Sequence, residues 1–154
     1  MKKLLLVTIL TALLISCSSR KQVEKAISSG NYDKAINDAL DKLETNKSKK
    51  SKADYIVMLQ DAYYKATERD LNNIKFLKKD NNPEHYQKIY ETHQSLNSRQ
   101  EAIKSLLPLK VNNKTIHFEF KDYSDDIVDS REKVSDYLYE VGINLLDSDS
   151  KSRI

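Results

Sequence analysis

The near absence of helix-breaking residues constrains the fold more than any other feature of this sequence. The chain has 154 residues, of which 2 are glycine and 2 are proline. An all-β sandwich or barrel needs a turn about every 8–12 residues, usually marked by glycine or proline. A phosphate-binding loop needs clustered glycines, whereas Gly30 and Gly142 are far apart. The sequence therefore excludes these classes, and its 39% content of hydrophobic residues excludes a disordered chain.

Two short helices are predicted near the start of the chain. Val23, Ala26 and Ile27 follow the spacing of one helix face, and a second run continues from Tyr32 to Leu43. Gly30 lies between them, where a left-handed residue would end the first helix. The segment GNYDKAI, residues 30–36, resembles the middle of a tetratricopeptide repeat, in which an alanine lets two helices approach closely. The resemblance implies an antiparallel pair of helices.

Longer helices are predicted over residues 53–77, 83–107 and 124–147, after a basic stretch at 46–52 (NKSKKSK) that we interpret as a loop. In the first of them the apolar spacing slips by one residue between Ala66 and Leu71. Without glycine or proline there, we expect one long helix whose buried face rotates, continuing through Phe76 and Leu77. Asn82 and Pro83 fit the cap and first position of the next helix. Ser124 is expected to cap the last one.

One segment departs from the helical spacing. Ile116, Phe118 and Phe120 alternate with polar residues, and Asn112-Asn113 suits a turn from Leu109–Val111, which predicts one short β-hairpin or extended segment near 109–120. The expected fold class is all-α, with antiparallel helical hairpins in a tetratricopeptide-like array or bundle. We expect one domain over residues 22–147 and a polar tail over 148–154.

The first 17 residues form a targeting pattern. Lys2 and Lys3 precede an apolar run from Leu4 to Ile15, which is too short for a stable membrane span but typical of a secretory signal. The sequence Leu14-Ile15-Ser16-Cys17 resembles the lipobox of bacterial envelope lipoproteins. This resemblance implies a signal peptide over 1–16, a diacylglyceryl group on Cys17, and a lipidated tether over 17–21. Cys17 is the only cysteine, so no disulfide can form within the chain.

The lipoprotein resemblance also implies a cellular location. Ser18, not aspartate, follows Cys17, which favours the outer membrane, facing the periplasm. The composition and the Ser-Cys-Ser-Ser junction are similar to lipoproteins of Bacteroidota. From Cys17 onward there are 24 basic and 23 acidic residues, so we expect no nucleic acid partner. The charge is uneven: residues 20–79 carry 14 basic and 9 acidic residues, and residues 110–154 carry 7 and 10.

Candidate chemistry is sparse. The three histidines, His85, His93 and His117, include no pair four residues apart, so a zinc site is not expected. The acidic cluster Asp122–Asp129 lacks the spacing of a calcium loop and suits the first turn of a helix. We find no set of nucleophile, base and orienting group, and we expect neither a cofactor nor a catalytic activity.

Tyrosine is the notable residue type, with nine copies against three of phenylalanine and none of tryptophan. A tyrosine ring can be buried while its hydroxyl stays in water, which suits contact surfaces. The sequence therefore predicts a membrane-anchored, non-catalytic scaffold or adaptor that binds another envelope protein, with the edge at 115–120 and these side chains as candidate contacts: Tyr55, Tyr63, Tyr64, Tyr86, Tyr90 and Tyr137.

Two alternatives remain open. One is a binder or hydrolase of envelope polysaccharide or peptide, with the Asp122–Asp129 cluster and His117 as its polar centre. The other is a structural spacer without a specific partner. For any single tyrosine, a place in an ordinary helical core is the competing interpretation.

Overall fold

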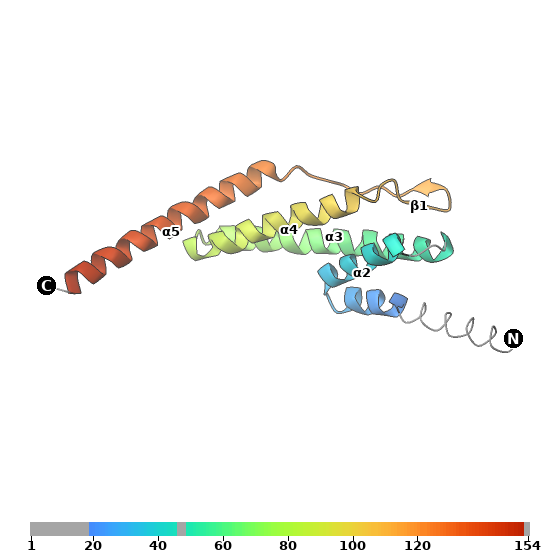
Figure 1. Cartoon of the computed structure of the whole chain (residues 1–154), viewed down its shortest axis with the longest axis horizontal. Coiled ribbons are helices and arrows are strands. Elements are labelled where there is room, and N and C mark those ends of the chain that lie inside the picture. Colours follow the sequence, from blue (N-terminus) through green and yellow to red (C-terminus); the bar gives the residue numbers. More distant parts are fainter. Residues whose placement is uncertain (1–18, 46–48, 153–154) are drawn as a thin grey trace, which may run out of the picture. The chain divides into compact units, whose positions relative to one another are not determined.

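The computed structural model describes residues 19–45 and 49–152. Within these ranges the chain is mostly helical, with one short antiparallel hairpin and connecting segments, which confirms the predicted fold class. Helical residues 19–28 come first. Figure 1 shows the elements that follow: α2 (Tyr32–Thr45), α3 (Lys49–Lys79), the 3₁₀ helix η1 (Pro83–His85), α4 (Tyr86–Lys104), β1 (Lys110–Val111), β2 (Lys114–Thr115) and α5 (Ser124–Ser152).

The described residues divide into two compact units. Unit 1 comprises 19–45, 49–67 and 102–118, and unit 2 comprises 68–101 and 119–152. The division falls inside α3 and α4, so both helices contribute to both units. The interpretation of 22–147 as a single domain stays a prediction. No helix in the described part of the chain is long and apolar enough to cross a membrane.

The first turn of unit 1 forms where the sequence predicts it. Gly30 has a φ of 76°, in the left-handed region, and the N–H of Asn31 donates to the carbonyl of Ala26 at 2.9 Å. Asn31 caps α2, since its side-chain oxygen accepts from the N–H of Lys34 at 3.3 Å. Ala35 and Ala39 of α2 are completely buried, as expected where helices approach closely.

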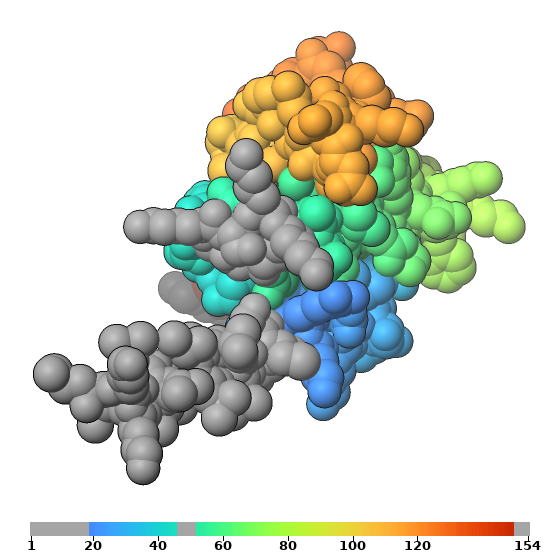
Figure 2. All heavy atoms as spheres, turned by 90° about the vertical axis from the view of Figure 1, so that its right-hand side faces the viewer, coloured from blue at the N-terminus to red at the C-terminus, as the bar shows by residue number. Residues whose placement is uncertain are grey.

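The β-hairpin of unit 1 has the predicted turn, but its second strand ends at Thr115, so the alternating residues 116–120 follow the strand and are not part of it. Lys110 pairs with Thr115, and Asn112 and Asn113 have φ values of 50° and 63°. Two consecutive positive φ values match the turn type that suits the twist of a two-residue hairpin, and asparagine tolerates them well. The segment after β2 lies against α3, as shown by the rings of Phe118 and Tyr63, whose centroids are 5.7 Å apart. Figure 2 shows residues 105–118 (yellow to orange) beside the green first half of α3.

Unit 2 is a helical hairpin joined by α5. The Asn82 side chain accepts from the N–H of Glu84 at 3.1 Å, which confirms the predicted cap with Pro83 as the first helical residue. The apolar core of this unit takes residues from all three helices and from the segment before α5: Ile74, Ile89, Leu96 and Tyr123, with Leu77 and Ile127 packed against them.

Several sequence predictions need correction. The predicted 46–52 loop is wrong for its second part, since α3 begins at Lys49; residues 46–48 lie outside the described residues. Leu71 and Phe76 are 41% and 72% exposed, so the buried face of α3 does not rotate onto them. It continues instead at Asp70, four residues after Ala66, as the helical period requires. The expectation of one unbroken helix is confirmed.

Two boundaries near the end of the chain also differ from expectation. Ser124 is the first residue of α5, and the carboxylate of Asp122 accepts from its N–H at 2.9 Å. The capping group is therefore Asp122, not the Ser124 hydroxyl. At its other end α5 continues as far as Ser152, through most of the predicted tail.

Candidate functional site

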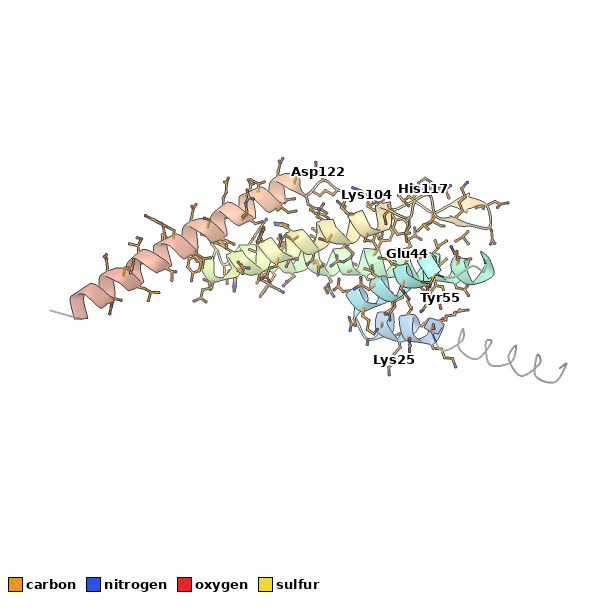
Figure 3. The ribbon with its side chains drawn as sticks, viewed as in Figure 1. Lys25, Glu44, Tyr55, Lys104, His117 and Asp122 are labelled. Atoms are coloured by element: carbon orange, nitrogen blue, oxygen red, sulfur yellow. The ribbon has the colours of Figure 1, made fainter. Side chains whose placement is uncertain are left out.

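The tyrosines proposed as partner contacts fall into different environments. In unit 1, Tyr55 and Tyr63 are each 2% exposed. Burial raises the pKa of the Tyr55 hydroxyl, and Figure 3 shows this residue on α3 beside α2. Tyr64 is 37% exposed, and its hydroxyl lies 3.5 Å from the carbonyl of His117. In unit 1, only Tyr64 of the three thus presents substantial ring surface, and a partner role for all three stays a prediction.

Unit 2 brings two of the remaining tyrosines together. Tyr86, Tyr90 and Tyr137 are all half-buried. The rings of Tyr86 on α4 and Tyr137 on α5 meet edge to face, with 6.4 Å between their centroids. The Tyr90 hydroxyl accepts a hydrogen bond from the Gln94 amide at 2.9 Å. Each of these rings keeps part of its surface in contact with solvent.

A small cleft of about 200 Å³ opens beside Tyr86 in unit 2. Leu77 and Ile89 supply apolar wall, and charged residues of both signs supply the rest. Such a volume is below the usual range of a drug-sized ligand site and is suited to one side chain or a small polar molecule. The lining comes from the ends of α3 and α4 and from α5: Leu77, Lys78, Asn81, Tyr86, Ile89, His93, Asp126, Asp129, Ser130 and Lys133.

His93 in the wall of this cleft joins α4 to α5. Its Nδ1 lies 3.1 Å from the hydroxyl of Ser130, and that hydroxyl donates to the carbonyl of Asp126 at 2.6 Å. Because the Ser130 hydroxyl donates its only proton to the Asp126 carbonyl, we infer that the imidazole Nδ1–H donates to Ser130 Oγ. Burial lowers the pKa of His93, as does the nearby charge of Lys78, while Asp126 opposes the shift. The neutral imidazole is therefore favoured at pH 7.

Two of the charged groups of the cleft interact with neighbouring side chains. The Lys121 ammonium donates to Asp126 at 2.7 Å, which lowers the pKa of that carboxyl. The ammonium of Lys133 lies 6.0 Å from the centroid of the Tyr86 ring, at the outer limit of a cation–π contact. The cleft thus presents two lysines and two carboxylates around an aromatic edge, an arrangement that orients a polar group without excess charge.

The residues of the acidic cluster have different roles in unit 2. Asp126 and Asp129 line the cleft, whereas Asp122 caps α5. Asp122 belongs to unit 2 and His117 to unit 1, and Figure 3 labels both residues. The backbone carbonyl of His117 accepts a hydrogen bond from the Gln60 amide at 2.9 Å. Within 19–45 and 49–152, no group of three or more His, Cys, Asp or Glu side chains could hold a metal ion.

Sequence reasoning missed the polar partners of His93. Ser130 is 4% exposed, and it occupies the core-facing side of α5 between Ile127 and Val134. A polar residue between apolar positions of a stripe was the available signal, because a buried hydroxyl needs a partner. Lys78 and Lys133 carried no such signal, since exposed lysines are common on any helix.

The predicted lipidation site, Cys17, lies outside the described residues, as does the signal peptide at 1–16. Comparison of the chain with known proteins gave no matching family model, no matching curated protein and no matching solved structure.

Proposed function

We propose that this protein is a non-catalytic scaffold or adaptor of a bacterial envelope, anchored through lipid on Cys17 to the outer membrane and facing the periplasm. It binds another envelope protein at the Tyr86–Tyr137 edge of unit 2. The single observation that supports this proposal is the meeting of these two half-buried rings, with 6.4 Å between their centroids, beside a cleft of about 200 Å³.

The chemistry of this edge suits protein recognition. Tyrosine is enriched among the residues that dominate binding energy, because a rigid ring provides a large contact area at low entropic cost. A side chain of the partner would enter the cleft against Leu77 and Ile89. Lys78, Asp129 and Lys133 would then fix its orientation by charge.

Site-specific photo-crosslinking tests the proposed surface. A photoreactive phenylalanine replaces Tyr137, which keeps an aromatic ring at the Tyr86 contact. A matched control places the same group at Lys34, an exposed position of α2 whose side chain pairs with Asp38. We expect ultraviolet light to join position 137, but not position 34, to one discrete envelope protein. Equal yields from the two positions, or no product from position 137, would contradict the proposal.

The anchor is tested separately by the variant Cys17→Ser. Without a thiol no thioether can form, so we expect the protein to leave the membrane fraction. Ser18→Ala serves as the control, because it changes the neighbouring residue and keeps the thiol. Retention of Cys17→Ser in membranes to the same extent as Ser18→Ala would refute lipid anchoring while leaving the Tyr86–Tyr137 surface untouched.

One observation favours a second function. The same cleft combines a neutral imidazole at His93 with both lysines and carboxylates, a set that suits a small polar ligand such as a fragment of envelope peptide or polysaccharide. Calorimetric titration with such fragments distinguishes the functions. Saturable binding that is lost in Lys133→Met would favour the binder, and the scaffold predicts no heat with any fragment.

A further inference from the structure

The second half of α5 carries an apolar surface that unit 2 does not cover. Leu138, Tyr139, Leu145 and Leu146 are 59%, 72%, 64% and 69% exposed. On the same helix Ile127 packs against the core of unit 2, so burial of the α5 stripe ends partway along the helix. Contiguous apolar surface of this kind on a water-facing helix usually marks an interaction site.

The same part of α5 is mainly acidic, with Lys151 as its single basic residue after Lys133. Between Val134 and Asp149 there are four acidic residues and no lysine or arginine: Asp136, Glu140, Asp147 and Asp149. A partner for this surface must therefore be apolar and basic. A second α5 is a poor partner, since antiparallel or parallel pairing would place the carboxylates of both copies close together.

Unit 1 holds a surface of the opposite character. A groove of about 860 Å³ is lined mainly by apolar side chains from α2, the start of α3 and the hairpin segment: Leu43, Ala53, Ile56, Val57, Leu106, Pro108, Leu109 and Val111. Its charged residues are Lys52, Lys110 and Asp54, and the Asp54 carboxylate is paired with Arg20 at 2.9 Å. The groove thus combines apolar and polar surface, and its charge has a positive balance.

From this match we propose that the acidic, apolar end of α5 in one copy binds the basic, apolar groove of unit 1 in a second copy. The leucines of α5 would enter the groove beside Val57, which is 52% exposed, and the α5 carboxylates would face Lys52 and Lys110. The groove is large enough for several side chains of a helix face. The contact does not involve the Tyr86–Tyr137 edge, so it goes beyond the proposed scaffold function.

This contact joins two different surfaces, which has a geometric consequence. Each copy that uses its α5 end still presents a vacant groove, and its partner still presents a vacant α5 end. Such heterologous contacts produce closed rings or open filaments instead of simple symmetric dimers. A lipid-anchored scaffold that assembles in this way would display many copies of its partner-binding edge side by side on a membrane.

Complementation between two differently tagged copies of the full chain tests the proposal. The α5 variant is Leu138→Ser with Leu145→Ser, and the groove variant is Val57→Asp, which adds a repelling charge. All three positions are exposed, so the fold should persist, and circular dichroism checks this. The control is Phe76→Ser, which removes a 72% exposed side chain from a different surface.

We expect wild-type copies, and copies carrying Phe76→Ser, to co-purify from membranes in neutral detergent, and less so as salt increases. Two α5 variants should not co-purify, nor should two groove variants. One α5 variant mixed with one groove variant should co-purify again, because one intact end meets one intact groove. Failure of the mixed pair, or the absence of any association between wild-type copies, would overturn the proposal without affecting the crosslinking result at position 137.

Discussion

The two units bury different kinds of side chain. Unit 1 contains 14 of the 18 buried apolar residues of the described chain, including Leu59, Ala62 and Ile103 at 0% exposure. Unit 2 contains four, but it holds all six buried polar or charged residues: Asp70, Thr92, His93, Arg99, Gln100 and Ser130. The division falls inside α3, whose first part belongs to unit 1 and whose second part belongs to unit 2, so the difference lies in what each part of this helix faces.

Because of this difference, we expect the stability of the two units to respond differently to substitutions. Burial of apolar surface has little directionality, so unit 1 depends mainly on volume and shape. Unit 2 depends on a few directional contacts. The Arg99 guanidinium donates to Asp70 at 2.6 Å, and the Gln100 amide donates to the carbonyl of Lys121 at 2.7 Å and accepts from its N–H at 3.2 Å. These bonds fix α4 against α3 and against the segment that leads to α5.

The largest effect is expected from Asp70→Ala. Asp70 and Arg99 keep 10% and 5% of their side chains exposed, so the variant leaves a buried guanidinium without its carboxylate. Loss of one partner of a buried pair costs about 3–5 kcal/mol. Urea unfolding measures the loss, and hydrogen exchange should place it in residues 68–101.

Asp61→Ala is the matched control for that prediction. It removes the exposed Asp61–Lys65 pair on the same helix, whose nitrogen and oxygen are 2.8 Å apart, and we expect a much smaller loss because water screens an exposed pair. Similar losses from the two variants would show that the buried charge pair does not distinguish unit 2.

The next effect is expected in unit 1 from Leu59→Ala. Leu59 is fully buried, and such truncations in a packed core cost about 2–5 kcal/mol through lost transfer energy and the cavity that remains. Urea unfolding again measures the change, with Val57→Ala, at an exposed position two residues away, as the control. If Leu59→Ala and Val57→Ala lost equal stability, the description of unit 1 as a volume-dependent core would be wrong.

The two glycines should respond in opposite directions. Gly30→Ala forces a side chain into the left-handed region at φ 76°, at a cost of about 1–2 kcal/mol. Gly142→Ala lies within α5, where an added Cβ meets nothing within 4 Å, so we expect a gain of about 0.5–1 kcal/mol from helix propensity. Thermal unfolding of both variants checks the signs, and a loss in Gly142→Ala would argue against a continuous α5.

The smallest effect concerns pH and belongs to unit 2. The pKa of His93 in the folded protein lies below its ordinary value of 6.5, mainly through burial. Between the folded pKa and 6.5 the unfolded chain binds more protons, so the stability that His93 contributes is complete above about pH 6.5 and is lost as pH falls through that window.

The charged groups around His93 affect its pKa in different directions. Lys78 and Lys121 lower its pKa, and Asp126 raises it. The pKa of Asp126 is itself held below 3.8, chiefly by the hydrogen bond from Lys121, so its contribution changes only at more acidic pH. We therefore expect His93→Gln to flatten the slope of stability against pH below 6.5. An unchanged slope in the variant would contradict the assignment of this pH dependence to His93.

The sequence predicted the local elements well because their causes are local. The left-handed Gly30, the Asn82 cap with Pro83, and the Asn112-Asn113 turn each depend on the conformational preferences of one or two residues. The helical period likewise predicted the four longer helices, α2, α3, α4 and α5. For the candidate site, however, the sequence identified Tyr86 and Tyr137 without showing that their rings meet.

What the sequence alone determined, then, is where the chain is helical and where it turns. Only the tertiary structure decided which residues of a helix are buried, because burial depends on what lies opposite. Asp70 replaces Leu71 on the buried face of α3 because Arg99 of α4 neutralises it. Tyr63 is buried while the adjacent Tyr64 is exposed, and the apolar stripe of α5 is covered at Ile127 and uncovered at Leu145, since no part of unit 2 packs there.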